Sequence, residues 1–281
     1  MDHAVEMMKC VRGRRSVRAF DGAALTAAER EDILRVAREA KTPYDLPIEW
    51  RVLNAGEHGL SSPVITGTET WIAGKLRRAD HAEEAFGFAF ERVVLYAWSR
   101  GIGTTWIAGT MDRPAFERAM ALEEGEVMPC VSPLGRPAAK MSLRETLMRK
   151  GIRADSRLSI GTLFFDGGFE KPLAESSAGS LSEPLEMVRW APSAVNKQPW
   201  RIVLAGDAAH FYEKRSRGYV SADGWDLQKI DLGIAMCHFA CGLEAQDRPY
   251  EFSVEDPGLS HPEDTFYIAT CRFASSHTEQ Q

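Results

Sequence analysis

The sequence has no long apolar run, no CxxC pair and no excess of positive charge. Without about 20 consecutive apolar residues we expect no membrane span, and the start of the chain has no signal-peptide core. The formal net charge of −6 argues against a general nucleic-acid binder, which needs basic surface to displace counterions. Five cysteines, an odd number, suit a reducing compartment, so we expect a cytoplasmic protein.

The phosphate-binding motifs of the common nucleotide folds are also missing. Neither GxGxxG nor GxxxxGK(S/T) occurs, which argues against a Rossmann dinucleotide site and against a P-loop. No catalytic triad or metal cluster is recognisable. The composition, with 44% apolar and 26% charged residues, is nevertheless ordinary for a globular protein of one large domain or two smaller ones.

The two halves of the chain contain a near-repeat. The heptapeptides WRVLNAG at 50–56 and WRIVLAG at 200–206 lie 150 positions apart (200 − 50), and each follows an expected helix. Later, FGFAFERV and LGIAMCHF share a pattern of small and apolar residues, with Gly87 and Gly233 spaced by 146 (233 − 87). Two matches in the same order favour an internal duplication over chance.

The expected elements are helices and strands in mixed layers. Thr26 and Glu29 form a capping box for a helix over 29–40, and Asp112 can cap a later one. Longer buried helices are expected over 81–99 and 226–243, and a helix over 183–190. Strands are expected at 50–56, 104–109, 126–135, 200–206 and 265–274.

Residues 169–182, FEKPLAESSAGSLS, have the Gly, Ser and Pro content of a linker. We therefore expect one repeat over 1–170 and a shorter second repeat over 171–281.

Three segments carry the polar groups of a candidate binding site. The first is RRSVRAF, in which Arg14, Arg15 and Arg18 surround Ser16. Arginine presents a rigid fork of donors that suits phosphate, and the serine hydroxyl adds another donor. A solvated basic face is the alternative interpretation.

The second segment is GIGTTWIAG, residues 101–109. Its glycines let the chain turn sharply out of the preceding helix, and the strand that follows can present backbone N–H groups to a ligand. A plain helix–strand turn around a buried Trp106 is the alternative.

The third segment is APSAVNKQPW, residues 191–200. Pro192 and Ser193 would end the preceding helix, while Asn196 and Gln198 offer amide donors and acceptors that suit the edge of a heterocycle. The alternative is a turn whose polar groups satisfy one another.

Taken together, these motifs resemble the nitroreductase family of FMN flavoproteins, as do PLGRPAAK and LFFDGG further along the chain. The similarity covers residues 9–170 and 182–243. It implies an α+β fold in which mainly antiparallel central sheets are flanked by helices. It also implies FMN as cofactor, NADH or NADPH as reductant, and hydride transfer through flavin N5 to a small organic acceptor.

The resemblance also implies the site residues. In that family two subunits interlock and each FMN lies at their interface, with the Pro-Ser-x-x-Asn turn supplied by the partner. Phosphate and ribityl oxygens would be bound by Arg14, Arg15, Ser16 and Arg18, with Arg157 matching a later phosphate ligand. The remaining contacts would come from Pro192, Ser193, Ala194 and Asn196 and from the strand backbone at Trp106, Ile107, Ala108 and Gly109. No catalytic side chain is implied, although the Ala108 N–H could point at N5.

The chain departs from the family pattern in an informative way. The first-half equivalent of the third segment is AKTPYDLPIEW, which has lost Ser, Asn and Gln and has Asp45 as the counterpart of Asn196. The second half lacks both RRSVR and GIGTTW. Each half thus lacks what the other keeps, which predicts two fused half-repeats that mimic the family dimer and a single composite FMN site in a monomer.

Two other functions stay open at this point. One is a degenerate flavoprotein that binds flavin, or nothing, without turnover. The other is a family member with a different reaction, such as reductive dehalogenation or flavin fragmentation.

Overall fold

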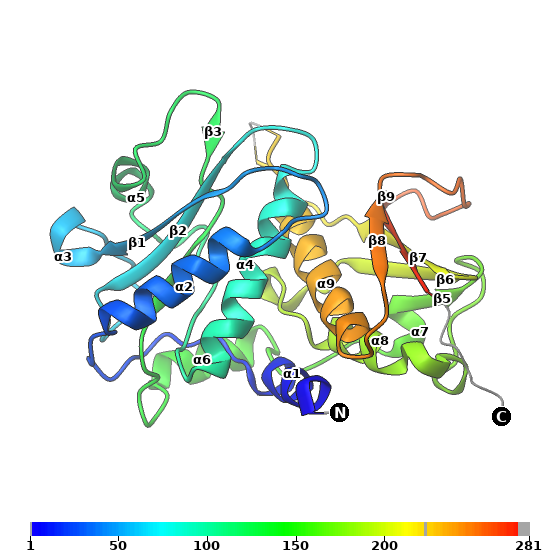
Figure 1. The fold of residues 1–281 in the computed structure, drawn as a ribbon, viewed down its shortest axis with the longest axis horizontal. Helices are drawn as coiled ribbons and strands as arrows, with labels where there is room; N and C mark the ends of the chain where they lie inside the picture. Colours follow the sequence, from blue (N-terminus) through cyan, green and yellow to red (C-terminus); the bar gives the residue numbers. More distant parts are fainter. Residues whose placement is uncertain (1, 222–223, 275–281) are drawn as a thin grey trace. The chain divides into compact units, whose positions relative to one another are not determined.

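The computed structural model describes residues 2–221 and 224–274 (Figure 1). They form two compact units. The N-terminal unit is Gly13–Ala154, and the C-terminal unit combines Met1–Arg12 with Asp155–Gln281. These units therefore do not divide at residue 170, where we expected the repeats to meet. The reason is that β5 (Phe164–Asp166) pairs in parallel with β6 (Trp200–Ala205), so the segment before residue 170 belongs to the second sheet.

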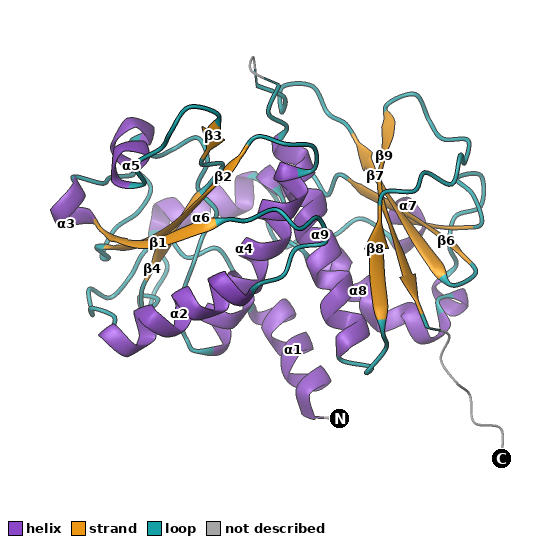
Figure 2. Cartoon of the chain, turned by 45° about the horizontal axis from the view of Figure 1, so that its top comes forward, coloured by secondary structure: helices purple, strands orange, loops and turns teal. Residues whose placement is uncertain are grey.

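The N-terminal unit contains an antiparallel sheet with helices on both of its faces (Figure 2). Its strands are β1 (Glu49–Asn54), β2 (Thr70–Arg77), β3 (Glu126–Val127) and β4 (Val131–Leu134), with β2 paired to each of the others. Its helices are α2 (Ala27–Glu39), α3 (Ala55–His58), α4 (Ala82–Ser99), α5 (Arg113–Ala119) and α6 (Leu143–Gly151).

One face of this sheet packs against α4 through Trp50. The Trp50 ring lies 5.5 Å from the ring of Phe86 and 5.3 Å from that of Phe90. Trp50 faces Gly74 in the β1–β2 register, and a Cβ atom at Gly74 would come within 2.5 Å of the Trp50 ring. Only glycine leaves room for the indole at this position.

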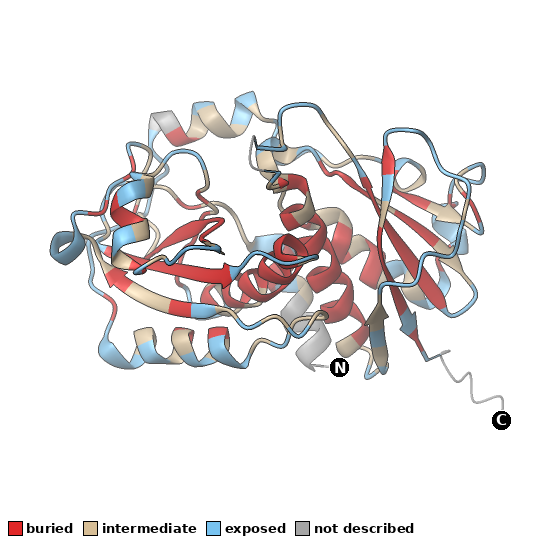
Figure 3. Ribbon diagram, turned by 90° about the horizontal axis from the view of Figure 1, so that it is seen from above, coloured by how far each residue is buried: buried red, intermediate tan, exposed pale blue. Residues whose placement is uncertain are grey.

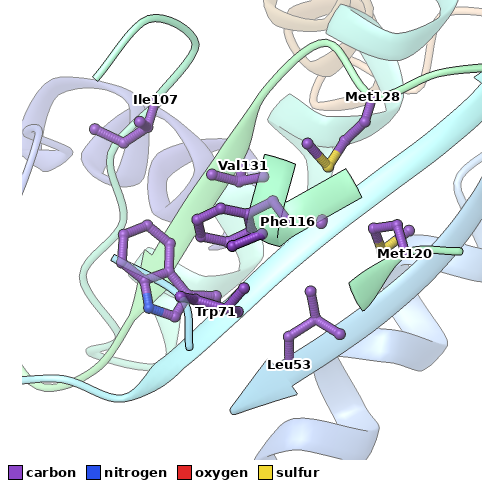
Figure 4. Close-up of a cluster of buried hydrophobic side chains, with 10 residues drawn as sticks. Leu53, Trp71, Ile107, Phe116, Met120, Met128 and Val131 are labelled. Carbon is purple, nitrogen blue, oxygen red and sulfur yellow. The ribbon is translucent and has the colours of Figure 1, made fainter. Parts of the chain in front are cut away.

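The other face of the same sheet is covered by α5 and holds a cluster of apolar side chains (Figure 4). Trp71 and Phe116 meet edge to face with their ring centroids 5.1 Å apart. The cluster also contains Leu53, Ile107, Met120, Met128 and Val131. Packing on both faces therefore fixes the position of this sheet within the N-terminal unit.

The C-terminal unit is built on the sheet β5-β6-β7-β9-β8, in which only the β5–β6 pair is parallel. The remaining strands are β7 (Ala208–Lys214), β8 (Tyr250–Ser253) and β9 (Thr265–Phe273). Its α-helices are α1 (Asp2–Gly13), α7 (Ile160–Leu163), α8 (Ser182–Trp190) and α9 (Leu227–Glu244). Short 3-10 helices lie at Glu175–Ser177, Gly179–Leu181 and Ala194–Asn196.

Two long helices, α4 in one unit and α9 in the other, are buried along most of their length (Figure 3). In the C-terminal unit α9 packs on β7, where the rings of Phe239 and Phe211 lie 5.6 Å apart. Among the described residues no helix has the length and apolar character needed to cross a membrane. All five cysteines are buried.

Most expected elements are confirmed, including the Thr26–Glu29 capping box and the Asp112 cap, whose side chain accepts from the Ala115 N–H. The strand expected at 104–109 is wrong. Only single bridges occur there, between Ser16 and Thr104 and between Ile107 and Val131. The ladder cannot continue because the Thr105 N–H donates to the Ser132 hydroxyl instead of to a strand carbonyl.

Candidate functional site

The structure brings the first two candidate segments together in the N-terminal unit. Ser16 and Thr104 form a parallel bridge, and the Val17 N–H donates to the Thr104 carbonyl over 2.8 Å. The approach is close: a Cβ atom at Gly103 would lie 2.8 Å from the Val17 side chain. The glycine at position 103 therefore lets residues 14–20, which we call the arginine-serine segment, lie directly against residues 103–107.

A buried acid, Glu91 of α4, links these two segments. Its carboxylate lies 3.8 Å from Nε of Arg14 and accepts a 3.1 Å hydrogen bond from the Trp106 indole N–H. Trp106 also packs on the Phe90 ring at 4.7 Å. Glu91 was not predicted from the sequence, although an acid within the apolar helix FGFAFERVV is a recognisable signal.

Four arginines gather at this place: Arg14, Arg15, Arg18 and Arg149, which we call the arginine cluster. Arg15 pairs with the buried Glu145 at 3.0 Å. Arg149 of α6 was not predicted; its charge lowers the pKa of both Arg14 and Arg18. Glu91 and Glu145 oppose part of this positive charge, at Arg14 and at Arg15 and Arg18.

Arg14 and Arg18 have polar atoms that the protein itself does not satisfy. The Nε atoms of both side chains are buried and make no hydrogen bond to any residue in 2–221 or 224–274. Burial lowers the pKa of Arg14, although Glu91 opposes this, and burial likewise lowers the pKa of Arg18 against the opposing charge of Glu145. Such donors are suited to a ligand that brings its own negative oxygens.

The backbone at 106–109 is only partly used. Ile107 exchanges two 2.9 Å hydrogen bonds with Val131, and the Ala108 carbonyl accepts from Arg113 over 3.0 Å. Within the described part of the chain the N–H groups of Ala108 and Gly109 donate to no oxygen. A Cβ atom at Gly109 would meet nothing within 4 Å, so the space beside its Cα atom is open.

The third segment lies in the C-terminal unit and forms a turn that is tied together internally. The Ser193 hydroxyl accepts from the Gln198 N–H over 2.9 Å, and the Ser193 carbonyl accepts from the Asn196 N–H over 3.0 Å. Gln198 is 3% exposed, and its amide binds the Asn196 carbonyl and the Leu158 N–H. Gln198 therefore supports the turn and does not face a ligand, as the self-satisfied alternative expected.

The same turn makes hydrogen bonds to the residues on either side of Arg157. The Asn196 amide donates to the Ser156 carbonyl over 3.0 Å, and Gln198 accepts from the Leu158 N–H over 3.0 Å. The Arg157 guanidinium lies over the Trp190 ring, 4.7 Å from its centroid. The structure thus brings together Arg157 and the turn at 192–196, two parts of the expected site that are far apart in the sequence.

A carboxyl group that the sequence analysis missed also contacts the turn. The Ala194 N–H lies 3.1 Å from each oxygen of Asp231, which is in α9 and is 4% exposed. Pro192 and Ser193 are both half-buried at the start of this turn.

The backbone of the turn corrects the register between the two halves. Val195 has a φ of 44° and Asn196 a φ of 58°, and Asp45 in the first half has a φ of 46°. The 150-residue spacing of Trp50 and Trp200 pairs Asp45 with Val195, and the similar left-handed backbone agrees with this pairing. Asp45 is therefore the counterpart of Val195 and not of Asn196.

Within residues 2–221 and 224–274 no set of three or more His, Cys, Asp or Glu side chains could hold a metal ion.

The two sheets flanked by helices define a nitroreductase-like α+β fold, which comparison with a solved structure shows. A "putative nitroreductase" from Thermotoga maritima aligns with a TM-score of 0.61 and 21% identity, over 95% of this chain and 93% of that chain. A family model described as "Putative TM nitroreductase" matches residues 6–243. The chain belongs to this nitroreductase family.

Two further solved structures are similar to about half of this chain. An FMN-dependent nitroreductase from Clostridium difficile aligns with a TM-score of 0.40 and 16% identity, over 48% of this chain and 90% of that chain. A "putative nitroreductase in complex with FMN" from Desulfovibrio desulfuricans aligns with a TM-score of 0.39 and 18% identity, over 50% of this chain and 94% of that chain. None of the curated proteins matches this chain.

Proposed function

We propose that this chain is an FMN-dependent oxidoreductase with nitroreductase-like activity. It would take hydride from NADH or NADPH and deliver it to a small organic acceptor in the cytoplasm. Membership of the nitroreductase family supports this class of reaction. When bound, FMN supplies the hydride-transfer chemistry, and the protein supplies position, electrostatics and access.

The observation that carries the proposal is the pair of buried Nε–H groups on Arg14 and Arg18. A buried donor without an acceptor is costly, and a phosphate would provide charged acceptors for both groups. Ser16 lies between these arginines in the sequence, and Arg15 and Arg149 add positive charge. The arginine cluster therefore fits the phosphate end of FMN.

The backbone of Trp106–Gly109 fits the flat end of the cofactor. The N–H groups of Ala108 and Gly109 have no acceptor among the described residues, so they can donate to polar atoms at the edge of the isoalloxazine. Donation from Ala108 to N5 would stabilise the reduced flavin. Trp106 and Ile107 are committed to Glu91 and Val131, and their role would be to hold this backbone in place.

We propose further that both halves of the chain contribute to one FMN, as in a fused pseudo-dimer. Arg157, Pro192, Ser193, Ala194 and Asn196 would complete the contacts to the phosphate, ribityl chain and flavin. The support for this is in the sequence, since each half keeps the motif that the other has lost. A chain that supplies its own second half needs no partner subunit, so the protein would be a flavin-bound monomer.

The absorption spectrum of the purified protein tests the activity. A bound yellow flavin that bleaches on anaerobic addition of NADPH or NADH, and regains its colour with a nitroaromatic acceptor, supports the proposal. A bound flavin that neither nucleotide bleaches would instead identify a degenerate flavin-binding protein. A protein that purifies colourless and does not bind added FMN would overturn the proposal. The monomer is checked separately by light scattering at low concentration, where a flavin-containing obligate dimer would contradict it.

A further inference from the structure

The turn at 193–198 contains an unfavourable backbone conformation. Val195 has φ 44° and ψ 32°, and the following Asn196 is also left-handed with φ 58°. Asparagine tolerates this region, but a β-branched residue is a genuine outlier there. Such residues persist only where their surroundings over-determine the conformation.

Asp231 is the group that holds the start of this strained pair. Both of its carboxyl oxygens lie 3.1 Å from the N–H of Ala194, the residue directly before Val195. The other end is held by the Ser193 hydroxyl, which accepts from Gln198, and by the Asn196 amide, which donates to Ser156. The strained residues are thus fixed from both sides.

Burying an ionised carboxyl group at this position is energetically unfavourable. Burial raises the pKa of Asp231 well above its ordinary value, which the Ala194 N–H opposes and the charges of Asp226 and Glu213 reinforce. The Arg215 guanidinium pairs with those two neighbours, at 3.1 Å from Glu213 and 3.4 Å from Asp226. The pKa of Tyr219 is raised mainly by burial and further by the charge of Asp231.

The first half of the chain shows that the fold itself does not require this acid. Asp231 stands two residues before Gly233 in α9, and Ala85 stands two residues before Gly87 in α4. Ala85 is fully buried. The half with alanine at this position is also the half whose turn has lost Ser, Asn and Gln. The carboxyl group is therefore found in the half that keeps the Ser, Asn and Gln of the turn, whereas the equivalent helix in the other half does without it.

We propose that Asp231 is a positioning residue for the bound flavin. By accepting the Ala194 N–H it fixes the left-handed Val195–Asn196 pair, and through the Asn196–Ser156 hydrogen bond it fixes the backbone next to Arg157. The identity of the ligand rests on the proposed function, whereas the effect of Asp231 on the turn can be measured without any ligand.

The test compares FMN dissociation constants of the full-length variants Asp231→Ala and Asp231→Asn, measured by fluorescence quenching. Alanine leaves the Ala194 N–H without an acceptor, which should raise the dissociation constant about fivefold to thirtyfold. Asparagine keeps an oxygen acceptor and should change it less than about threefold. Glu213→Gln, which changes a neighbouring buried acid that does not contact the turn, should also stay within about threefold.

A second substitution separates positioning from a general loss of structure. Glycine adopts the left-handed conformation without the steric cost of valine. Adding Val195→Gly to Asp231→Ala should therefore recover most of the lost FMN affinity. Should Asp231→Ala not fold, Asp231→Leu replaces it, because leucine is of similar size and offers no acceptor.

Amide hydrogen exchange in FMN-free protein gives the readout that does not depend on flavin. Exchange at Ala194 and Asn196 should be faster in Asp231→Ala and close to wild type in Asp231→Asn. If these rates behave as expected but wild-type protein binds no FMN, the proposed function is wrong. Asp231 then still fixes the turn, but the turn does not bind flavin. If Asp231→Ala leaves both exchange and FMN affinity unchanged, or if Asp231→Asn is as damaging as alanine, the inference is overturned.

Discussion

Glu91 and Arg14 form a buried ion pair, in which the carboxylate side chain is 0% exposed and the guanidinium side chain 6% exposed. The same carboxylate accepts from the Trp106 indole, so one acid in α4 fixes the arginine-serine segment and the segment beside it. A ligand phosphate near Arg14 would therefore meet a guanidinium that is already held in place.

Replacing this acid should unpair the arginine. Glu91→Gln is expected to lower the free energy of unfolding by about 3 kcal/mol, because a buried charge loses its counter-charge. Added FMN should recover part of that loss, since its phosphate returns negative charge near Arg14. Urea unfolding with and without FMN measures both effects. Glu31→Gln is the control, because Glu31 pairs with Arg38 on the exposed surface of α2, and equal losses in the two variants would contradict the prediction.

If Arg14 and Arg18 bind the FMN phosphate as proposed, losing either one should weaken FMN binding. A charge-assisted hydrogen bond contributes about 1.5–3 kcal/mol, so Arg14→Ala or Arg18→Ala should raise the FMN dissociation constant about tenfold to a hundredfold. Fluorescence quenching on titration of FMN measures this. Arg35→Ala removes an exposed arginine of α2 that pairs with Glu39, and it should leave the dissociation constant unchanged. Similar binding by all three variants would remove the arginine cluster from the site.

Asn196 and Asp45 are turn residues with similar backbone conformations in the two halves, although they do not occupy equivalent positions. Both have a left-handed backbone, so alanine at either position carries a similar conformational cost. Only Asn196 donates to Ser156, which is next to Arg157. Asn196→Ala should therefore weaken FMN binding or slow the reduction of FMN by NADPH. Asp45→Ala should do neither. Equal harm from the two substitutions would mean that the second-half turn has no special role.

The loss of complementary motifs predicts the flavin stoichiometry. We expect one FMN for each chain, because only one arginine-serine segment and one Pro-Ser-x-x-Asn turn are present. Flavin released by heat and quantified against protein gives the ratio directly. A ratio near two would show that both halves bind flavin independently.

The environment of Asp231 predicts that stability falls as pH rises. Burial, together with Asp226 and Glu213, raises the pKa of Asp231 in the folded protein against the opposing Ala194 N–H. Above the ordinary Asp pKa of about 3.9, the unfolded chain loses a proton that the native state keeps. The native state then binds more protons, so the free energy of unfolding decreases from about pH 4 up to the folded pKa of Asp231.

Asp231→Asn isolates this effect, since asparagine does not titrate and the other acids remain in both proteins. Urea unfolding at several pH values above 4 should show the stability of the wild type falling relative to the variant. A difference that stays constant across this range would show that Asp231 keeps an ordinary pKa after folding.

The elements that the sequence predicted are those with a local signal. The capping box of α2, the long apolar helices α4 and α9 and the repeated strands β1 and β6 follow from residues close together in the chain. The central strands β2 and β7 were missed. Both are buried on almost every residue, so they lack the alternation of apolar and polar side chains that marks a strand, and Gly74 interrupts β2.

The site was predicted as separate segments and not as contacts. Arg14 meets Glu91 and Ala194 meets Asp231 across long stretches of chain, and no local pattern encodes such pairs. A charged residue inside an apolar helix was the available cue for both acids. The role of Gln198 stayed open for a related reason: its amide suits a ligand and a backbone equally well, and its burial and its hydrogen bonds favour the backbone.

The C-terminal unit begins with α1 and resumes only at Asp155, so its two parts are made at very different times. The ribosome completes all of Gly13–Ala154 before the strands that belong with α1 exist. At ordinary rates of synthesis the interval between the synthesis of α1 and that of β9 is on the order of tens of seconds. The residues of the N-terminal unit are therefore all present before those of the C-terminal unit, so this unit can fold first. The C-terminal unit can be completed only after β5–β9 have been synthesised, long after α1.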